Sequence, residues 1–436
     1  TVVIGAPLRK DNCLYNCAIF LSDGQIKLVV PKSYIPTYSE FYESRWFASG
    51  KQILNTTIDI LGNTIPFGTH FLLEDTNSEV VIGAEICEDL WVADKPSTHA
   101  CLQGANIIVN LSASDEVIGK QEYRRNMVLQ QSSSCYCGYC YVSSGMQESS
   151  TDLVFSAHSM IAENGTMLAE SIFTSGNHCE TALIDLEKIQ YNRTHQSTFE
   201  SEEGYQRIQA SIPAITNTND ISVDALCKTL QEENYYIARN PFIPSDAQTR
   251  LDRCKKILQI QANGLATRVR ATHIYNLVIG VSGGLDSTLA LLVMHEAQKI
   301  EPKIHIIAYT LPNHGNTTSL TYNNAIHLMQ ALHTEIREVA IEKGVQLHLQ
   351  ELGHGGTYKG EGDTTYENAQ ARYRTYILMD AANMENGLVV GTGDLSELAL
   401  GWCTYNGDHM SMYAVNASVP KTLVSYICQT YADMCE

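Results

Sequence analysis

The chain has 436 residues, of which 44% are hydrophobic, and a formal net charge of −19. This length and composition are typical of two or three packed domains rather than one. The acidic balance argues against a general nucleic-acid or anionic-membrane partner, because no basic surplus is present to neutralise phosphates, and no run of about 18 consecutive apolar residues predicts a membrane span.

The 13 cysteines fit a reducing, cytoplasmic compartment better than a disulfide framework, because the chain is long and its patterning is α/β. Cys135, Cys137 and Cys140 follow the spacing C-x-C-x-x-C, which occurs in some metal sites. No second group of ligands lies nearby in the sequence, and the flanking residues are strand-like and aromatic. We therefore predict buried, reduced thiols here rather than a metal site.

Residues 1–190 are predicted to form a first domain. Short apolar runs typical of strands occupy residues 1–8, 16–24, 26–32, 80–89, 105–114 and 139–145. Helical patterns cover residues 98–103 and 122–135. Strands with interspersed helices indicate packed α/β layers.

Residues 191–240 are polar and rich in turn-forming residues, which indicates a linker. Residues 241–436 then alternate strands and helices. A helix is expected over 245–272, with Ser245 or Asp246 as its cap. Strands follow at 277–281, 303–312, 334–341 and 387–391, separated by helical segments. This alternation predicts a doubly wound parallel sheet with ligands at the carboxyl ends of its strands.

The first strand of this second domain leads into a glycine turn, Ser282-Gly283-Gly284-Leu285-Asp286-Ser287. Flexible backbone amides at a helix N-terminus, together with hydroxyl groups, suit a pyrophosphate. The turn is not a P-loop, because no lysine follows its second glycine. A carboxylate beside an anion calls for a cation between them, and Mg²⁺ binds both kinds of oxygen. The alternative is a tight turn whose aspartate caps a helix.

This turn resembles the signature of the ATP pyrophosphatase family, whose members cleave ATP between the α and β phosphates. The segment 367–424, from "ENAQARYR" to "NASVPKTLV", resembles NAD synthetases within that family. The resemblance implies ATP binding by Ser282, Gly283, Gly284, Leu285, Asp286, Ser287, Thr392 and Lys421, deamido-NAD binding by Asn368, Arg372, Thr404 and Asp408, and Mg²⁺ at Asp286 and Glu397. Without the resemblance, each of these charges has an ordinary alternative. Arg372 would lie on the solvated face of a long helix, Glu397 would be a carboxylate in the first turn of a helix, and Lys421 would be a surface lysine.

Two segments of the first half carry a second set of candidate residues. Residues 31–47, which contain Lys32, and the turn "GAEICEDLW", which contains Cys87, resemble the lysine and nucleophile segments of the nitrilase family. The resemblance implies an α-β-β-α sandwich in which a Cys87 thiolate attacks an amide and Lys32 stabilises the charges. It also implies glutamine binding by Tyr38, Glu88 and Ser114. Cys87 alone would be read as buried packing.

The general base of nitrilases is a glutamate upstream of the lysine, and residues 1–31 contain no glutamate. Glu43 matches a secondary glutamate of the family instead. We therefore expect a fragment that lacks both ends of a longer protein and hydrolyses glutamine poorly, unless Glu43 or Glu85 has taken over the role.

A nitrilase-like amidase joined to an NAD synthetase domain resembles the glutamine-dependent NAD synthetase family. That resemblance implies hydrolysis of glutamine, adenylation of deamido-NAD by ATP, and amidation by the released ammonia, in a homo-oligomer that keeps the ammonia from bulk water. Two alternatives stay open: another glutamine-dependent amidotransferase of the ATP pyrophosphatase class, and a nucleotide-binding regulatory module without chemistry.

Overall fold

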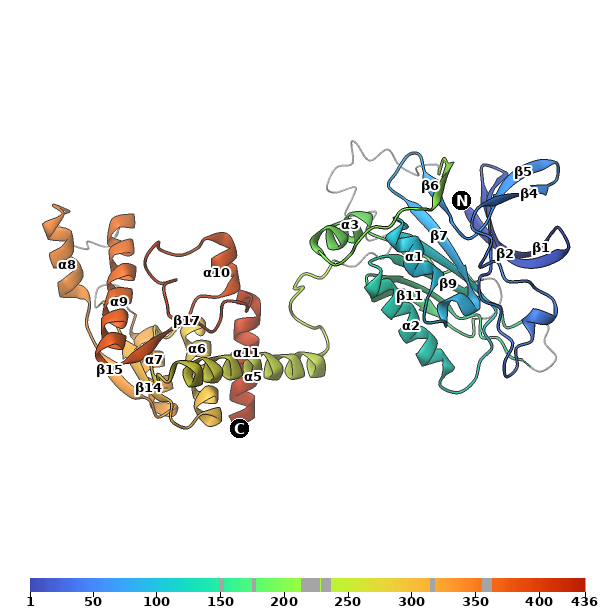
Figure 1. The fold of residues 1–436 in the computed structure, drawn as a ribbon. Coiled ribbons are helices and arrows are strands. Elements are labelled where there is room, and N and C mark those ends of the chain that lie inside the picture. Colours follow the sequence, from blue (N-terminus) through green and yellow to red (C-terminus); the bar gives the residue numbers. More distant parts are fainter. Residues whose placement is uncertain are drawn as a thin grey trace. The chain divides into compact units, whose positions relative to one another are not determined.

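The computed structural model describes residues 1–148, 153–174, 178–212, 228, 237–313, 318–354 and 363–435. The chain divides into two compact units, Thr1–Tyr236 and Ile237–Glu436 (Figure 1). Each unit has its own sheets and its own buried core, so each is considered by itself. Among the described residues, no helix combines the length and the apolar character that crossing a membrane would need.

The first unit contains a five-stranded sheet in the order β1-β2-β3-β5-β4. Its strands are β1 (Val2–Lys10), β2 (Cys13–Ser22), β3 (Gln25–Pro31), β4 (Thr56–Ile60) and β5 (Asn63–Phe67). Asp23 and Gly24 connect β2 to β3 with φ angles of 51° and 69°. Two consecutive positive φ values give the turn whose twist matches antiparallel strands, which explains why an Asp-Gly pair stands there.

A second, seven-stranded sheet has the order β11-β10-β9-β8-β7-β6-β12. Its strands are β6 (Phe71–Asp75), β7 (Val81–Ile86), β8 (Ile107–Ser112), β9 (Gly138–Ser143), β10 (Ser159–Glu163), β11 (Thr166–Ser171) and β12 (Gln206–Ala210). The central strands β7, β8 and β9 are parallel. Their carboxyl ends therefore meet at one edge of the sheet, where Cys87 directly follows β7.

The two sheets of this unit pack face to face. Phe20 of β2 and Leu28 of β3 share a buried cluster with Leu73 of β6 and Ile86 of β7. Successive residues of β2 point to opposite faces, so its Cys17 belongs to a separate cluster on the outer face. Helices α1 (Pro96–Leu102) and α2 (Lys120–Ser134) cover the other face of the seven-stranded sheet, and α3 (Leu186–His195) follows β11.

This arrangement confirms the predicted α/β class with a nitrilase-like pair of sheets, and it refines two details. Against the outer face of the five-stranded sheet, the described residues place a loop containing Ala48 and Ile53 rather than long helices. The predicted linker of residues 191–240 also contains strand β12, which pairs with β6 inside the first unit. Much of the remaining predicted linker lies outside the described residues.

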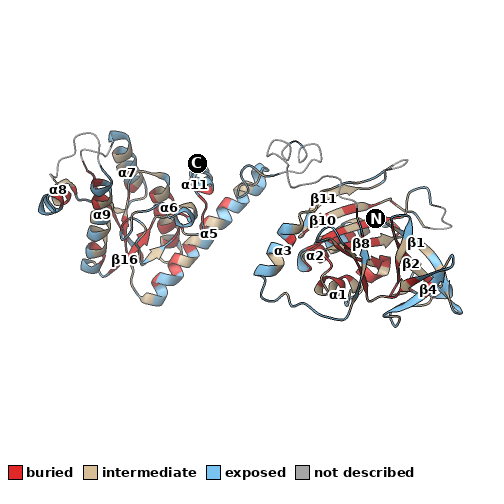
Figure 2. Cartoon of the chain, turned by 90° about the horizontal axis from the view of Figure 1, so that it is seen from above, coloured by how far each residue is buried: buried red, intermediate tan, exposed pale blue. Residues whose placement is uncertain are grey.

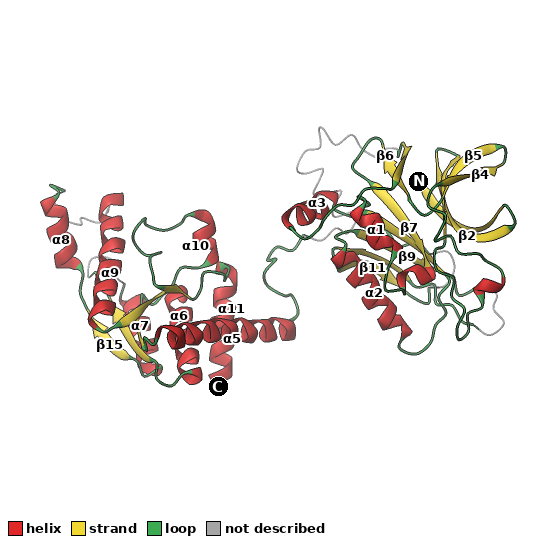
Figure 3. Ribbon diagram, viewed as in Figure 1, coloured by secondary structure: helices red, strands yellow, loops and turns green. Residues whose placement is uncertain are grey.

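The second unit is built on one parallel sheet in the order β15-β14-β13-β16-β17. Its strands are β13 (Asn276–Gly280), β14 (His305–Thr310), β15 (Glu335–Glu338), β16 (Gly387–Gly391) and β17 (Tyr413–Ala414). Figure 3 shows helices on both sides of these strands, and Figure 2 shows that the strands are largely buried. Double coverage explains why β13 and β16 read as uninterrupted apolar runs.

Alternate residues of β13 serve the two cores of this unit. Leu277 and Ile279 pack with α5 (Ala247–Thr272), α6 (Leu285–Ile300) and α11 (Lys421–Cys435), whereas Val278 packs with α8 (Glu342–Glu351) and α9 (Thr364–Met384). The remaining helices are α7 (Ser319–Ala331) and α10 (Leu395–Leu400). Asp246 caps α5 by accepting a hydrogen bond from the Thr249 N–H at 2.6 Å, one of the two caps that the sequence allowed.

The core of the first unit gives a testable contrast between two buried tyrosines of β9. The Tyr139 hydroxyl donates to the buried carboxyl group of Glu85 and accepts from Asn110 Nδ2 at 3.0 Å. The Tyr141 hydroxyl, although also fully buried, makes no hydrogen bond of ordinary geometry within the described residues. Glu85 is therefore committed to this structural network, and its pKa is raised by burial.

We expect Tyr139→Phe to lower the free energy of unfolding by about 1–3 kcal/mol, because it leaves buried polar partners unsatisfied. Tyr141→Phe should leave it unchanged or slightly raised, since no such partner is lost. Urea unfolding of the full chain, followed by circular dichroism, measures both. Equal losses in the two variants would contradict the assignment of these hydrogen bonds.

Candidate active sites

The Cys87 turn follows β7 and opens the 3₁₀ turn η2 (Cys87–Leu90). Cys87 has φ of 48°, a left-handed conformation that is unfavourable for a residue with a side chain. The side chain of Asp89 stabilises this turn by accepting the Ile86 N–H at 2.9 Å. It also accepts the Tyr34 N–H at 2.9 Å. One buried carboxyl group thus joins the turn after β7 to the segment that follows Lys32.

Asp89 is 2% exposed, and burial raises its pKa to about 7, although the hydrogen bond from Ile86 opposes the shift. A raised carboxyl pKa means that ionisation is costly at this position. The Asp89 side chain accepts hydrogen bonds from backbone N–H groups and does not line either cavity beside Cys87. Sequence reasoning missed Asp89, although its position two residues after Cys87 in a tight turn was visible.

Lys32 and Glu43 form an ion pair beside Cys87. The Lys32 Nζ lies 2.7 Å from Glu43 Oε2 and 2.9 Å from Oε1, and the lysine side chain is completely buried. Lys32, Glu43 and Cys87 line a common cavity of about 610 Å³. Burial raises the pKa of the Cys87 thiol, and the positive charge of Lys32 opposes this while Glu43 adds to it. The structure therefore brings the three residues together around one cavity.

A second cavity, of about 570 Å³, borders Cys87 on another side. Its lining includes the predicted residues Tyr38, Glu88 and Ser114 and one residue that sequence reasoning missed, Lys120. The Tyr38 hydroxyl donates to Glu88 at 2.9 Å. Burial, and next to it this hydrogen bond, raises the pKa of Tyr38 to about 12. The cavity thus offers carboxylate, hydroxyl and ammonium groups within one enclosure.

Lys120 owes its position to its neighbours in this cavity. Its Nζ is paired with Asp115 and lies over the rings of Phe41 and Trp91, at 5.2 and 5.6 Å from their centroids. A cation held between aromatic faces is attracted by their negative π surfaces. Lys120 is the first residue of α2, which begins two residues before the helical pattern that the sequence predicted.

In the second unit, the turn after β13 has a conformation that depends on glycine. Gly283 has φ of 80°, and a Cβ built there would lie 2.0 Å from the Thr321 carbonyl oxygen. Ser287 Oγ accepts the Ser282 N–H at 3.2 Å and donates to the Gly284 carbonyl at 3.0 Å. These bonds fix the conformation of the glycine turn directly before α6.

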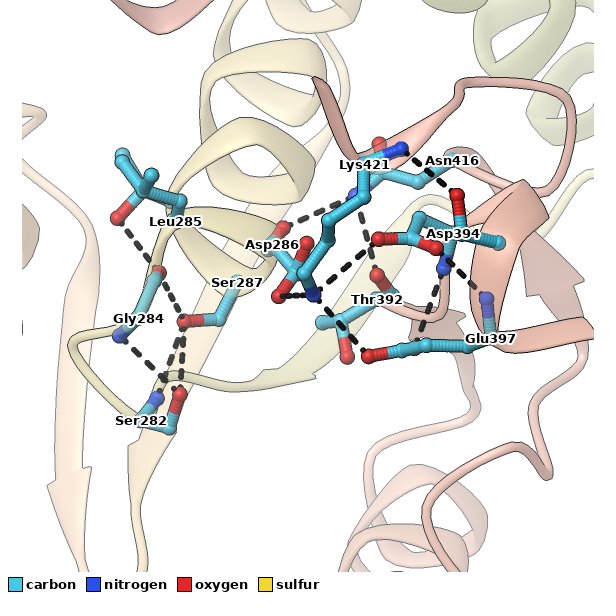
Figure 4. A network of polar contacts seen from close by, with 12 residues as sticks. Ser282, Gly284, Leu285, Asp286, Ser287, Thr392, Asp394, Glu397, Asn416 and Lys421 are labelled. Atoms are coloured by element: carbon cyan, nitrogen blue, oxygen red, sulfur yellow. Dashed lines mark hydrogen bonds and ion pairs between the residues drawn. The ribbon is translucent and has the colours of Figure 1, made fainter. Parts of the chain in front are cut away.

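Three carboxylates from two turns meet at Lys421, the first residue of α11 (Figure 4). The Lys421 Nζ lies 2.7 Å from Asp286 Oδ2 and 3.2 Å from both Asp394 Oδ2 and Glu397 Oε1. Although burial opposes it, hydrogen bonds to Asp286 and Asp394 raise the pKa of Lys421 above its ordinary value. The turn after β13, the start of α10 and the start of α11 therefore share one charged site.

Asp394 was missed by sequence reasoning although it is the most buried member of this carboxylate cluster, with a side chain that is 0% exposed. It caps α10 by accepting the Glu397 N–H at 2.9 Å, while Glu397 reaches back to the Asp394 N–H. The sequence Asp-Leu-Ser-Glu forms a capping box in the structure, so Asp394 combines helix capping with a place in the carboxylate cluster. One oxygen each of Asp286, Asp394 and Glu397 lies within 4.8 Å of the others.

Asn416, also missed, holds the two turns of this site together. Its Nδ2 donates to the Asp286 carbonyl at 2.9 Å and to the Thr392 carbonyl at 3.2 Å. Its Oδ1 accepts from Gln261 of α5 at 3.0 Å. Asn416 is fully buried, and it fixes Thr392 and Asp286 relative to each other through backbone atoms.

The four residues predicted to bind deamido-NAD also lie together. Asn368 Oδ1 accepts from Thr404 Oγ1 at 2.8 Å, and Asp408 Oδ1 accepts the Thr404 N–H at 2.8 Å. Arg372 Nε donates to the Tyr405 carbonyl at 3.0 Å. Because α9 precedes β16, its N-terminal half lies toward the carboxyl edge of the sheet. The long helix and the loop after α10 thus form one polar surface.

Cys135 and Cys137 are buried free thiols, and Cys140 is partly buried and also free, as expected. Within the described ranges, the group with spacing suited to a metal ion is the carboxylate cluster and not these cysteines.

Comparison with known families matches both halves of the chain. The carbon-nitrogen hydrolase family matches residues 1–193, and the NAD synthase family matches residues 257–432. The glutamine-dependent NAD(+) synthetase of Mycobacterium bovis is 41% identical over 434 residues, covering 98% of this chain and 63% of the relative. The enzyme of the same name from Mycobacterium leprae is 41% identical over 442 residues with the same coverage.

A more distant relative with this name, from Thermotoga maritima, is 28% identical over 99% of this chain and 67% of its own length. The chain spans 63% of the length of the two mycobacterial relatives. Both matched domains occur in the order that the sequence predicted, and the chain is similar over 98% of its length to enzymes named glutamine-dependent NAD(+) synthetase.

Proposed function

We propose that this chain contains the glutaminase site and the adenylation site of an enzyme that makes NAD from deamido-NAD, ATP and glutamine. The observation that carries the proposal is the presence of two separate constellations, Lys32 with Cys87 and Asp286 with Glu397 and Lys421, each built on turns that follow β-strands. A family member that only bound nucleotide would not need a buried lysine beside a cysteine in a strained turn.

In the first unit, the Cys87 sulfur attacks the carboxamide carbon of glutamine. The carbon–nitrogen bond breaks as the amide nitrogen takes up the thiol proton and leaves as ammonia, and water later hydrolyses the thioester to give glutamate. Lys32 supplies positive charge next to the sulfur and to the oxyanion that forms at the carbonyl. Its ion pair with Glu43 keeps the lysine extended toward Cys87 in an otherwise buried position.

The cavity of Tyr38, Glu88, Ser114 and Lys120 supports recognition of the amino-acid end of glutamine. Glu88 offers an acceptor for the α-ammonium group. Lys120 and the Ser114 hydroxyl offer donors for the α-carboxylate. A zwitterion needs both kinds of partner, and this enclosure contains both.

In the second unit, the glycine turn supports binding of the ATP phosphates through its N–H groups. Asp286, Asp394 and Glu397 have the hard oxygen ligands that Mg²⁺ prefers, and the buried Asp286 Oδ1 makes no hydrogen bond within the described residues. When bound, Mg²⁺ would neutralise phosphate charge. Lys421 adds a second cation there, while Asn368, Arg372, Thr404 and Asp408 bind deamido-NAD.

The deamido-NAD carboxylate attacks the α-phosphorus of ATP and releases pyrophosphate, after which ammonia displaces AMP and forms the amide. A homo-oligomer remains a prediction from the family resemblance. A direct test is to measure pyrophosphate release and NAD formation from deamido-NAD and ATP, with glutamine or with ammonia as the nitrogen source. A protein that releases no pyrophosphate with either source would refute the proposal.

Cys87→Ala should abolish glutamine-supported NAD formation in the full-length protein and spare ammonia-supported formation. The reason is that Cys87 belongs to the first unit, whereas the ATP turn belongs to the second. Initial rates with the two nitrogen sources measure the effect. Equal loss with both would contradict the division of labour between the units.

Asp286→Asn, Asp394→Asn and Glu397→Gln should each raise the Mg²⁺ concentration for half-maximal pyrophosphate release by about tenfold or more, because ligand charge sets affinity for a hard cation. Asparagine can still cap α10, so Asp394→Asn separates charge from helix capping. Glu296→Gln, on the same helix as Asp286 but paired with Lys299, is the control. An unchanged Mg²⁺ requirement in all three variants would exclude the proposed metal site.

Glu43→Gln should increase the alkylation rate of Cys87 by iodoacetamide at neutral pH several-fold, and Lys32→Gln should decrease it. The negative charge of Glu43 raises the Cys87 pKa, and the positive charge of Lys32 lowers it. Removing one or the other charge therefore changes the thiolate population in opposite directions. Mass spectrometry of the peptide that contains Cys87 gives the rates. Slower alkylation in Glu43→Gln would show that Glu43 acts mainly by holding Lys32.

A further inference from the structure

Arg124 of α2 is an arginine without any solvent exposure, and it makes three separate contacts. Its Nη2 lies 2.6 Å from Glu116 Oε2, its Nη1 donates to Ser114 Oγ at 3.2 Å, and its Nε donates to His158 Nδ1 at 3.0 Å. Burying a guanidinium is costly unless its donors are satisfied and its charge is paired. Each contact therefore holds the guanidinium in place next to Ser114.

The direction of every hydrogen bond in this group follows from chemistry. A guanidinium has donors only, so His158 Nδ1 must accept and therefore carries no proton. Neutral imidazole then carries its proton on Nε2, which lies 3.1 Å from Glu170 Oε1 and donates to it. Burial lowers the pKa of His158, and the neighbouring charge of Arg124 lowers it further, both of which favour this neutral form.

The same reasoning gives the hydrogen-bond directions of the Ser114 hydroxyl group. Its oxygen accepts from Arg124, which leaves the single hydroxyl proton directed elsewhere. Among the residues that the structure describes, no acceptor takes that proton, and Ser114 lines the cavity beside Cys87 and Lys120. The hydroxyl is thus prepared to donate to an acceptor that enters the cavity.

We infer that Arg124 is a positioning residue that, together with His158 and Glu170, fixes the Ser114 hydroxyl as a hydrogen-bond donor to the α-carboxylate of glutamine. The inference rests on the proposed glutaminase function, because the acceptor is its substrate. It assigns a role in substrate recognition to three residues of which none lines the cavity itself. Arg124 acts through Ser114 and does not touch the reacting atoms.

The tautomer of His158 is the first test, and it needs no substrate. In uniformly ¹⁵N-labelled full chain, the His158 resonances are assigned by their loss in His158→Gln. We expect an unprotonated Nδ1 and a protonated Nε2 at neutral pH. A protonated Nδ1 would overturn the inference, because it cannot accept from Arg124.

Glutamine affinity is the second test, measured by calorimetry in the full chain with Cys87→Ala, which prevents turnover. Ser114→Ala and Arg124→Lys should each weaken binding by roughly 10-fold or more, as for a lost hydrogen bond to a charged group. The double variant should be no weaker than Ser114→Ala alone, because Arg124 acts through Ser114. Additive losses would overturn the inference.

Two further variants separate hydrogen-bond direction from packing. His158→Gln can accept from Arg124 and donate to Glu170, so it should bind glutamine nearly as the parent does, whereas His158→Leu should weaken binding like Ser114→Ala. Arg125→Lys is the matched control, since Arg125 also pairs with Glu170, at 2.7 Å, but does not contact Ser114. Circular dichroism confirms that each variant is folded.

Equal weakening in His158→Gln and His158→Leu would overturn the inference, because packing alone would then explain the result. If the parent with Cys87→Ala does not bind glutamine at all, the proposed substrate is wrong. The tautomer measurement would still decide whether the direction of the Arg124 network is as inferred.

Discussion

The burial of charged groups at the carboxyl edges of parallel strands is the constraint on which both sites depend. Parallel strands end together, so the turns that follow them bring distant parts of the chain to one edge. In the second unit this places Asp286 after β13 beside Asp394 after β16, whereas in the first unit Cys87 after β7 meets Lys32 after β3 because the two sheets pack face to face. Each charge is then stable only because an opposite charge or a backbone dipole meets it.

The two sites satisfy this constraint differently. Lys32 is completely buried and has a bidentate carboxylate partner, so its position is fixed before any ligand arrives. Lys421 is half exposed and lies among three carboxylates, which leaves excess negative charge for a divalent cation. Buried side chains that face away from the ligands hold each arrangement: Asp89 joins the two turns of the first site, and Asn416 joins those of the second.

Much of the fold could be predicted from the sequence. The site residues that the sequence did not reveal were missed for physical reasons. Alternation of strands and helices gave the parallel sheet of the second unit, and local turn chemistry gave the glycine turn and the cap of α5. Asp394 and Lys120 were missed because their partners at the sites come from distant segments of the chain: Lys421 for Asp394, and Phe41 and Trp91 for Lys120. Arg124 was missed because a charged residue inside a helical pattern is normally exposed.

The sequence by itself determined which residue types are available and where strands end, because those properties depend on neighbours along the chain. Its resemblance to known families singled out Cys87, Lys32, Asp286, Glu397 and Lys421 as candidate site residues. Only the tertiary structure decided that Asp394 joins the carboxylate cluster, that β12 completes the first unit's sheet, and that Arg124 contacts Ser114, Glu116 and His158. These contacts join residues from separate elements, so they exist only once the sheets and helices have packed.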